Sequence, residues 1–139
     1  MKILIDTNII IENLTRRSGY IESLKILNLC ENGTVSGIIT TVTVMDVMYI
    51  LRKHLNRDET RQAMQKLMLI VDVVSVLKSD IQEAFSDMLT DFEDTVQACV
   101  AARIKANYII TRNIKDFKGS KVPAILPPSF LDIIMCPNN

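Results

Sequence analysis

A chain of 139 residues with 48% hydrophobic and 23% charged side chains has the composition of one ordinary globular domain, so disorder is not expected. Its 16 basic and 16 acidic residues give a net charge of zero, which argues against a protein that coats nucleic acid but does not exclude a nuclease. No run of 18 apolar residues, no secretory signal and no Cys-x-x-Cys spacing is present, so we expect a cytoplasmic protein with no membrane partner and no disulfide framework.

Apolar runs of strand length alternate along the chain with segments of helical periodicity. The first half predicts a strand over 2–6, a helix from residue 8, a helix over 20–32 and a strand over 35–39. A threonine-rich cap at 40–43 and helices over 44–55 and 59–70 follow, the latter capped by Asp58. The second half predicts a strand over 71–77, a helix from a Ser79 cap to about Asp91 and a helix from about Asp91–Asp94 to Asn107. A strand over 108–111, a loop over 112–123, a brief strand, a break at Pro127–Pro128 and a short helix complete it. This alternation indicates an α/β fold with a parallel sheet covered on both faces.

Polar residues follow several of the predicted strands, and this is where open α/β sheets bind their ligands. Asp6 ends the first strand between apolar residues, so its burial requires a partner that is cationic or donates hydrogen bonds. The other candidates lie near helix starts or after a strand: Asp46, Asp91, Asp94, Asn113 and Asp116. Carboxylates that converge without as many Lys or Arg side chains repel one another, so they require a divalent cation or shared protons. Oxygen ligands favour Mg²⁺ or Mn²⁺ over zinc, and the sole histidine, His54, is expected at the surface.

Four segments carry a family resemblance: "ILIDTNIII", "VMDVMYIL", "DFEDTVQACVA" and "YIITRNIKDF", the last followed by "VPAILPPSFL". In this order and spacing they resemble the PIN-domain family of metal-dependent ribonucleases, and within it the VapC-like toxins. The resemblance covers nearly the whole chain. It implies a single PIN-like domain over 1–139, built as a three-layer sandwich with a central parallel sheet flanked by helices.

The resemblance also implies roles for individual residues. Asp6, Asp94 and Asp116 would be metal ligands and catalytic residues, and Asp46 would join them in catalysis as the acidic residue of the helix after the second strand. Many family members have glutamate in place of Asp46. Asn113 lies where many members have a fourth acidic residue. Residues expected to contact substrate or orient the ligands are Thr7, Asn8, Asp91, Thr111, Arg112 and Asn113.

Helix capping remains an alternative role for two of these aspartates, Asp91 and Asp94, because aspartate is common at helix starts. The solvated helix face is the expected place of Asp87.

The function implied is hydrolysis of RNA phosphodiester bonds with Mg²⁺ or Mn²⁺, by the toxin of a toxin–antitoxin pair. RNA, an antitoxin protein and a second copy of the chain would be its partners. The alternative is a catalytically silent PIN-like interaction module, which the neutral side chain of Asn113 favours because it lowers the charge at a second metal position. A phosphatase or nucleotide-binding protein is disfavoured, because the four glycines form neither G-x-x-x-x-G-K nor G-x-G-x-x-G.

Overall fold

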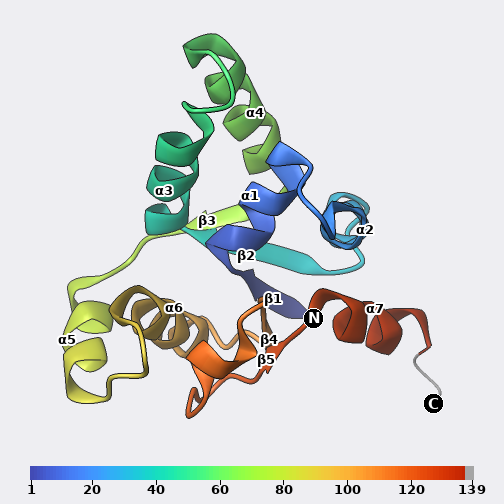
Figure 1. The fold of residues 1–139 in the computed structure, drawn as a ribbon. Helices are drawn as coiled ribbons and strands as arrows, with labels where there is room; N and C mark the ends of the chain where they lie inside the picture. Colours follow the sequence, from blue (N-terminus) through green and yellow to red (C-terminus); the bar gives the residue numbers. More distant parts are fainter. Residues whose placement is uncertain (137–139) are drawn as a thin grey trace.

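The computed structural model describes residues 1–136, and within them a five-stranded parallel sheet carries helices on both faces (Figure 1). The strands are β1 (Lys2–Ile5), β2 (Ser36–Thr40), β3 (Asp72–Val74), β4 (Tyr108–Ile110) and β5 (Ala124–Ile125). The helices are α1 (Thr7–Thr15), α2 (Tyr20–Glu31), α3 (Thr41–Leu51), α4 (Arg57–Ile70), α5 (Lys78–Ser86), α6 (Phe92–Arg103) and α7 (Pro127–Met135), with a 3₁₀ turn, η1 (Ile114–Phe117). The three-layer α/β architecture expected from the sequence is confirmed.

The central strand β1 separates two hydrophobic cores. Ile3 and Ile5 pack with side chains of α1, α2, α3, α4 and α7, whereas Leu4, between them, packs on the opposite face with Ala101 of α6. All three β1 residues are fully buried, as expected when successive side chains point to opposite faces of a sheet covered on both sides. The near-continuous apolar run at the start of the chain therefore reflects burial on both faces.

The order of the strands shows where it reverses within the sheet, and α/β sheets commonly bind ligands at such a point. The order is β3-β2-β1-β4-β5, so the chain moves from β1 outward to β2 and β3 and then crosses to the other side of β1 to form β4. Ile5 pairs with Ile110, and the Asp6 N–H donates to the Ile110 carbonyl at 3.0 Å. The residues after β1 and β4 are thus adjacent at the point where strand order reverses, which is where α/β sheets bind ligands.

Two helix starts differ from the prediction because of capping. Helix α3 begins at Thr41, three residues before the predicted start, because the Thr40 hydroxyl accepts a hydrogen bond from the Thr43 N–H at 3.1 Å. Helix α4 is capped by Asn56 and not by Asp58: the Asn56 side chain accepts from the N–H of Glu59 at 2.9 Å. Two potential caps lie within three residues of each other, and composition alone did not separate them.

The C-terminal half differs from the prediction at several further points. The helix expected from a Ser79 cap to Asp91 is α5, which begins at Lys78 with Leu77 at its N-cap, so Ser79 lies inside the helix, and it ends at Ser86. Helix α6 ends at Arg103 and not at Asn107. The strand expected over 71–77 contains only residues 72–74, and the loop over 112–123 contains η1. The predicted break at Pro127–Pro128 is the first turn of α7, where the missing proline N–H groups have no intrahelical partner to lose.

No helix within residues 1–136 is long and apolar enough to cross a membrane.

Candidate active site

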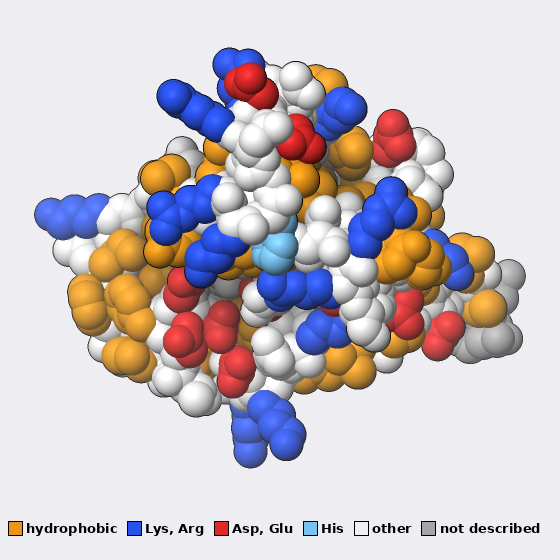
Figure 2. Space-filling view, turned by 45° about the horizontal axis from the view of Figure 1, so that its top comes forward, with side chains coloured by type: hydrophobic (Ala, Val, Ile, Leu, Met, Phe, Trp, Pro, Cys, Tyr) orange, Lys and Arg blue, Asp and Glu red, His pale blue; other side chains and the backbone are white. Residues whose placement is uncertain are grey.

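A pocket of about 280 Å³ opens at the carboxyl ends of β1, β2 and β4, and we call it the acidic pocket. Its lining contains six carboxylates and no Lys or Arg: Asp6, Thr7, Asn8, Asp46, Ile50, Asp91, Glu93, Asp94, Gln97, Asn113 and Asp116. Figure 2 shows a cluster of acidic side chains on one face, flanked by Lys and Arg side chains. The zero net charge of the chain therefore hides a local concentration of negative charge.

Asp6 lies at the base of the acidic pocket and is only 3% exposed. Thr111 donates to its Oδ2 at 2.9 Å, and the Gln97 side-chain amide donates to its Oδ1 at 3.1 Å. Burial raises the pKa of Asp6, and these two donors with the N–H groups of Thr7 and Asn8 lower it by less. The carboxylate is thus held in one orientation by neutral donors, without a cationic partner.

Helix α6 supplies three carboxylates from its first turn. Asp91 caps the helix, its Oδ1 accepting from the Asp94 N–H at 3.0 Å. Burial, followed by the charges of Asp6, Asp91 and Asp116, raises the pKa of Asp94 to about 7. The alternative roles considered for Asp91 and Asp94 thus separate: Asp91 caps the helix at the rim, whereas the Asp94 side chain faces the other carboxylates.

Asp46 reaches the acidic pocket from the second turn of α3 and is half-buried. Its apolar neighbours do not enclose it, because Met45 is 70% exposed. A hydrogen bond with Asp46, then burial, then the charges of Asp46, Asp91 and Asp94 raise the pKa of Glu93 to about 8. The Glu93 carboxyl therefore keeps its proton near neutral pH in the absence of a metal and can donate it in the hydrogen bond with Asp46.

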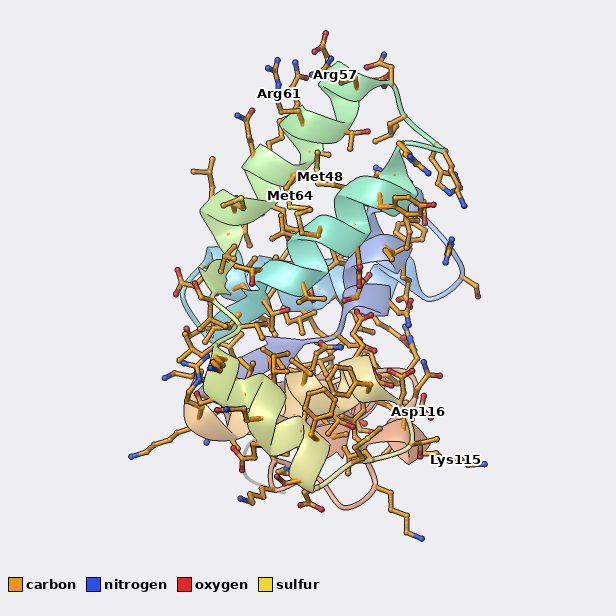
Figure 3. The ribbon with its side chains drawn as sticks, turned by 90° about the vertical axis from the view of Figure 1, so that its left-hand side faces the viewer. Met48, Arg57, Arg61, Met64, Lys115 and Asp116 are labelled. Atoms are coloured by element: carbon orange, nitrogen blue, oxygen red, sulfur yellow. The ribbon has the colours of Figure 1, made fainter. Side chains whose placement is uncertain are left out.

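The segment after β4 closes the acidic pocket. Asn113 and Asp116 both line it, and Asp116 belongs to η1, where Figure 3 labels it beside Lys115. The Asn113 N–H donates to the Thr111 hydroxyl at 3.0 Å, so the same hydroxyl that orients Asp6 also fixes the turn into η1. Figure 3 places Arg57 and Arg61 at the far end of α4, away from Asp116.

Two predicted site residues, Thr111 and Arg112, do not line the acidic pocket; Thr111 still donates to Asp6, whereas the hydrogen bonds of Arg112 lead away from the pocket. Arg112 donates to both oxygens of Glu12, at 3.0 and 2.8 Å, and pairs with Glu22 at 2.6 Å. It also donates to the carbonyl of Gly19, where a Cβ atom would lie 2.5 Å from the guanidinium. Arg112 thus ties the α1–α2 turn to the loop after β4.

Thr7, Asn8 and Thr111, which were expected to contact substrate or orient the ligands, differ in burial and in their hydrogen-bond partners. Thr111 is fully buried and contacts Asp6, while the Thr7 hydroxyl hydrogen-bonds to that of Thr43 at 2.8 Å. Asn8 is exposed at the pocket. The exposed side chain of Asp87 does not line the acidic pocket, in agreement with its expected place.

Three residues that line the acidic pocket were not predicted from the sequence: the apolar Ile50 and two polar residues of α6, Glu93 and Gln97. The spacing of the two polar residues is informative. They lie four residues apart on α6, and Gln97 is three residues after Asp94, so helical spacing places all three on one side of the helix. This helical spacing is the sequence signal that predicts Glu93 and Gln97 beside Asp94.

The chemistry of the donor set fits a hard divalent cation, because the side chains lining the pocket offer oxygen ligands with an excess of negative charge. As arranged here, no three His, Cys, Asp or Glu side chains within residues 1–136 are grouped closely enough to hold a metal ion. Burial is the largest cause of the raised pKa of Asp94, and the hydrogen bond with Asp46 is the largest cause for Glu93. The charges of neighbouring carboxylates add to both, and a cation would neutralise this charge. Binding would require the carboxylates to move closer together.

Residues 2–115 match the profile of the PIN domain family. The chain belongs to that family. No curated protein shows significant similarity to this PIN domain.

Solved structures of toxin complexes share its fold. VapBC2 from Rickettsia felis, bound to a DNA fragment of its promoter, gives a TM-score of 0.69 at 16% identity, covering 91% of this chain and 98% of that one. A toxin–antitoxin complex from Klebsiella pneumoniae gives 0.65 at 26% identity, covering 89% and 96%. VapC20 from Mycobacterium tuberculosis, described as a Sarcin-Ricin loop cleaving toxin, gives 0.60 at 12% identity, covering 77% and 86%.

Proposed function

We propose that this PIN domain, as a single domain over residues 1–139, is a Mg²⁺- or Mn²⁺-dependent endoribonuclease and the toxin of a toxin–antitoxin pair. The observation that carries the proposal is the convergence of six carboxylates, without a lining cation, where strand order reverses. Membership of the PIN family and the fold shared with VapC toxins support it.

In this proposal Asp6, Asp94 and Asp116 hold the metal. Thr111 and Gln97 keep the Asp6 carboxylate oriented through their hydrogen bonds. Asp46, hydrogen-bonded to Glu93, provides a further carboxylate at the opposite wall. When bound, Mg²⁺ supplies Lewis-acid chemistry: it neutralises charge on the phosphoryl oxygens and makes water a better nucleophile. Once the carboxylates have drawn together around the metal, these charges would be in position before the substrate arrives, which lowers the cost of reorganisation during the reaction.

The proposed substrate is RNA, and in this proposal the basic side chains that flank the acidic cluster (Figure 2) contact its phosphates. An antitoxin protein is the proposed partner, because the Rickettsia felis and Klebsiella pneumoniae structures are toxin–antitoxin complexes. A homodimer in the cytoplasm completes the proposal.

Cleavage of RNA by the purified protein tests this function. We expect cleavage with Mg²⁺ or Mn²⁺, none after EDTA, and none by Asp6→Asn, because that change removes the buried charge and keeps the side-chain volume. Asp132→Asn is the matched control, since Asp132 is exposed on α7, outside the acidic pocket. Cleavage that survives EDTA, or that is equal in Asp6→Asn, contradicts the proposal.

Metal titration separates the enzyme from the silent interaction module. Calorimetry with Mn²⁺ should show binding to the wild type and to Asp132→Asn and no binding to Asp6→Asn. Metal binding without RNA cleavage would support the silent module, which the neutral Asn113 at the pocket favours.

A further inference from the structure

A second pocket, of about 220 Å³, adjoins the acidic pocket, and we call it the apolar pocket. It lies between the start of α3 and the helices α5 and α6, and it is lined by Thr40, Val42, Ile81, Phe92, Glu93, Val96 and Gln97. Glu93 and Gln97 line both pockets. A ligand that spans the shared wall would therefore reach the carboxylates and the apolar side chains together.

Gln97, which lines both pockets, has an unsatisfied acceptor among the described residues. The residue is 2% exposed, and its Nε2 donates to Asp6 at 3.1 Å. Its Oε1 is buried and has no hydrogen-bond partner within residues 1–136. Turning the amide over would place Oε1 against the Asp6 carboxylate, where two acceptors would oppose each other. The oxygen is therefore held as a free acceptor, and a buried acceptor without a partner calls for a donor from outside the chain.

An aromatic ring forms another part of the apolar pocket. Phe92 is half-buried, and its ring stacks on that of Phe85, with 5.0 Å between centroids and 27° between planes. This stacking fixes the ring in one orientation. A fixed aromatic ring beside branched apolar side chains suits a flat, uncharged ligand, and unpaired bases of RNA bind on such rings.

These features select a base over the other parts of a nucleotide. A phosphate would be repelled by the adjoining carboxylates unless a metal accompanied it, and a ribose offers no flat face to Phe92. A base has apolar faces, and adenine, guanine and cytosine carry an exocyclic amino group at the edge as a hydrogen-bond donor.

We propose that the apolar pocket binds the nucleobase next to the phosphodiester that is cut, with the Gln97 Oε1 accepting a hydrogen bond from the exocyclic amino group. This inference rests on the proposed ribonuclease function and extends it to substrate selection. It predicts a preference for adenine, guanine or cytosine over uracil at one position beside the cut, because the only edge donor of uracil, its N3–H, lies between two carbonyl oxygens that the adjoining carboxylates would repel. Glu93 and Gln97, which both pockets share, place that base next to the metal site.

Filling the apolar pocket tests the assignment without altering the carboxylates. Val42→Phe and Ile81→Phe should each lower kcat/KM on RNA by about tenfold or more and weaken the base preference, because they remove the stacking space. Leu131→Phe is the matched control, because Leu131 lines a different pocket, between α2 and α7. Mn²⁺ affinity should be equal in all three variants and the wild type. Unchanged kcat/KM and unchanged preference in both filling variants would overturn the assignment.

A binding measurement makes the assignment independent of cleavage. In NMR titrations with Mg²⁺, AMP should shift the methyl signals of Val42, Ile81 and Val96 more than purine riboside 5′-monophosphate, which lacks the amino group, and ribose 5-phosphate should leave them unchanged. Equal shifts with all three ligands, or none with any, would overturn the apolar pocket as a base site. Selective shifts in a protein that does not cut RNA would instead overturn the proposed function and keep the base site.

Discussion

At the scale of single residues, the acidic pocket holds carboxylates in an environment that disfavours their charge. Asp6 is buried and Asp94 is half-buried, and burial is the largest cause of the raised pKa of both. At Asp6 burial outweighs the nearby hydrogen-bond donors, and at Asp94 the charges of neighbouring carboxylates add to it. Such perturbed groups in a pocket are typical of functional sites. In the metal-free protein the desolvation and mutual repulsion of these carboxylates lower the stability, so replacing one carboxylate at a time separates its contribution to function from its effect on stability.

Asp94→Asn should abolish RNA cleavage without unfolding the protein. The change removes a charge, keeps the shape and leaves the Asp94 N–H free to donate to Asp91. We expect activity to fall by more than about 100-fold, the upper range for residues that only orient a metal ligand. The metal-free thermal midpoint at neutral pH should stay level or rise. A fully active Asp94→Asn protein would remove Asp94 from the site.

Sequence motifs located Asp6, Asp46, Asp94 and Asp116, and the structure brings all four to one pocket. Two features of the site could not be predicted from local sequence patterns, because each depends on residues distant in the chain. The direction of Arg112 depends on Glu12, 100 positions earlier in the chain, and no local pattern contains that pair. The unpartnered oxygen of Gln97 exists only because Asp6 engages the amide nitrogen across the sheet edge.

Among the secondary-structure elements, helix α6, packed against α5, brings Glu93, Asp94 and Gln97 to the edge of the sheet. The sequence predicted both helices, but it placed the end of α5 five residues late, because apolar residues continue in "FSDML" after the hydrogen bonding has ended. Buried Asp80 of α5 and Arg103 at the end of α6 form an ion pair at 3.0 Å, and Arg103 also donates to the carbonyl of Ser75 at 2.7 Å. This pair links the two ends of the hairpin that positions α6.

Arg103→Met should destabilise the protein by about 2 kcal/mol, a typical value for hydrogen bonds to a charged group. The change leaves the Asp80 carboxylate, which is 1% exposed, without its cation. Urea unfolding with an unchanged m-value would measure the loss. Lys121→Met is the matched control: its pair with Glu83 is 71% and 50% exposed, so we expect less than about 1 kcal/mol. Equal losses in the two variants would refute a structural role for the Asp80–Arg103 pair.

At the scale of the whole molecule, charge is separated although the total is zero. Six carboxylates line the acidic pocket, and the 16 basic residues lie elsewhere on the chain. The topology makes this separation effective, because the parallel strands β1, β2 and β4 all end at the same edge of the sheet. The stability of the whole domain should therefore depend on pH and on divalent cations.

The raised pKa values determine whether folding stability rises or falls with pH. Asp94 titrates at 3.8 in its ordinary state and at about 7 in the folded protein, so between these values the folded state binds more protons than the unfolded state. Stability from this group is complete below pH 3.8 and is lost as pH rises through about 7. Glu93, raised from 4.5 to about 8, acts in the same direction.

Thermal melts of the wild type and Asp94→Asn in EDTA isolate this contribution, because other titrating groups largely cancel in the difference. The midpoint of Asp94→Asn minus that of the wild type should grow as pH rises from about 4 to about 7 and then level off. Mg²⁺ or Mn²⁺ should raise the wild-type midpoint more at higher pH, since the cation competes with protons for the carboxylates and binds only the folded state. Asp132→Asn should track the wild type at every pH. A difference that does not vary with pH, or a metal effect that is equal in Asp94→Asn, would show that the acidic pocket neither stores this repulsion nor binds the cation through Asp94.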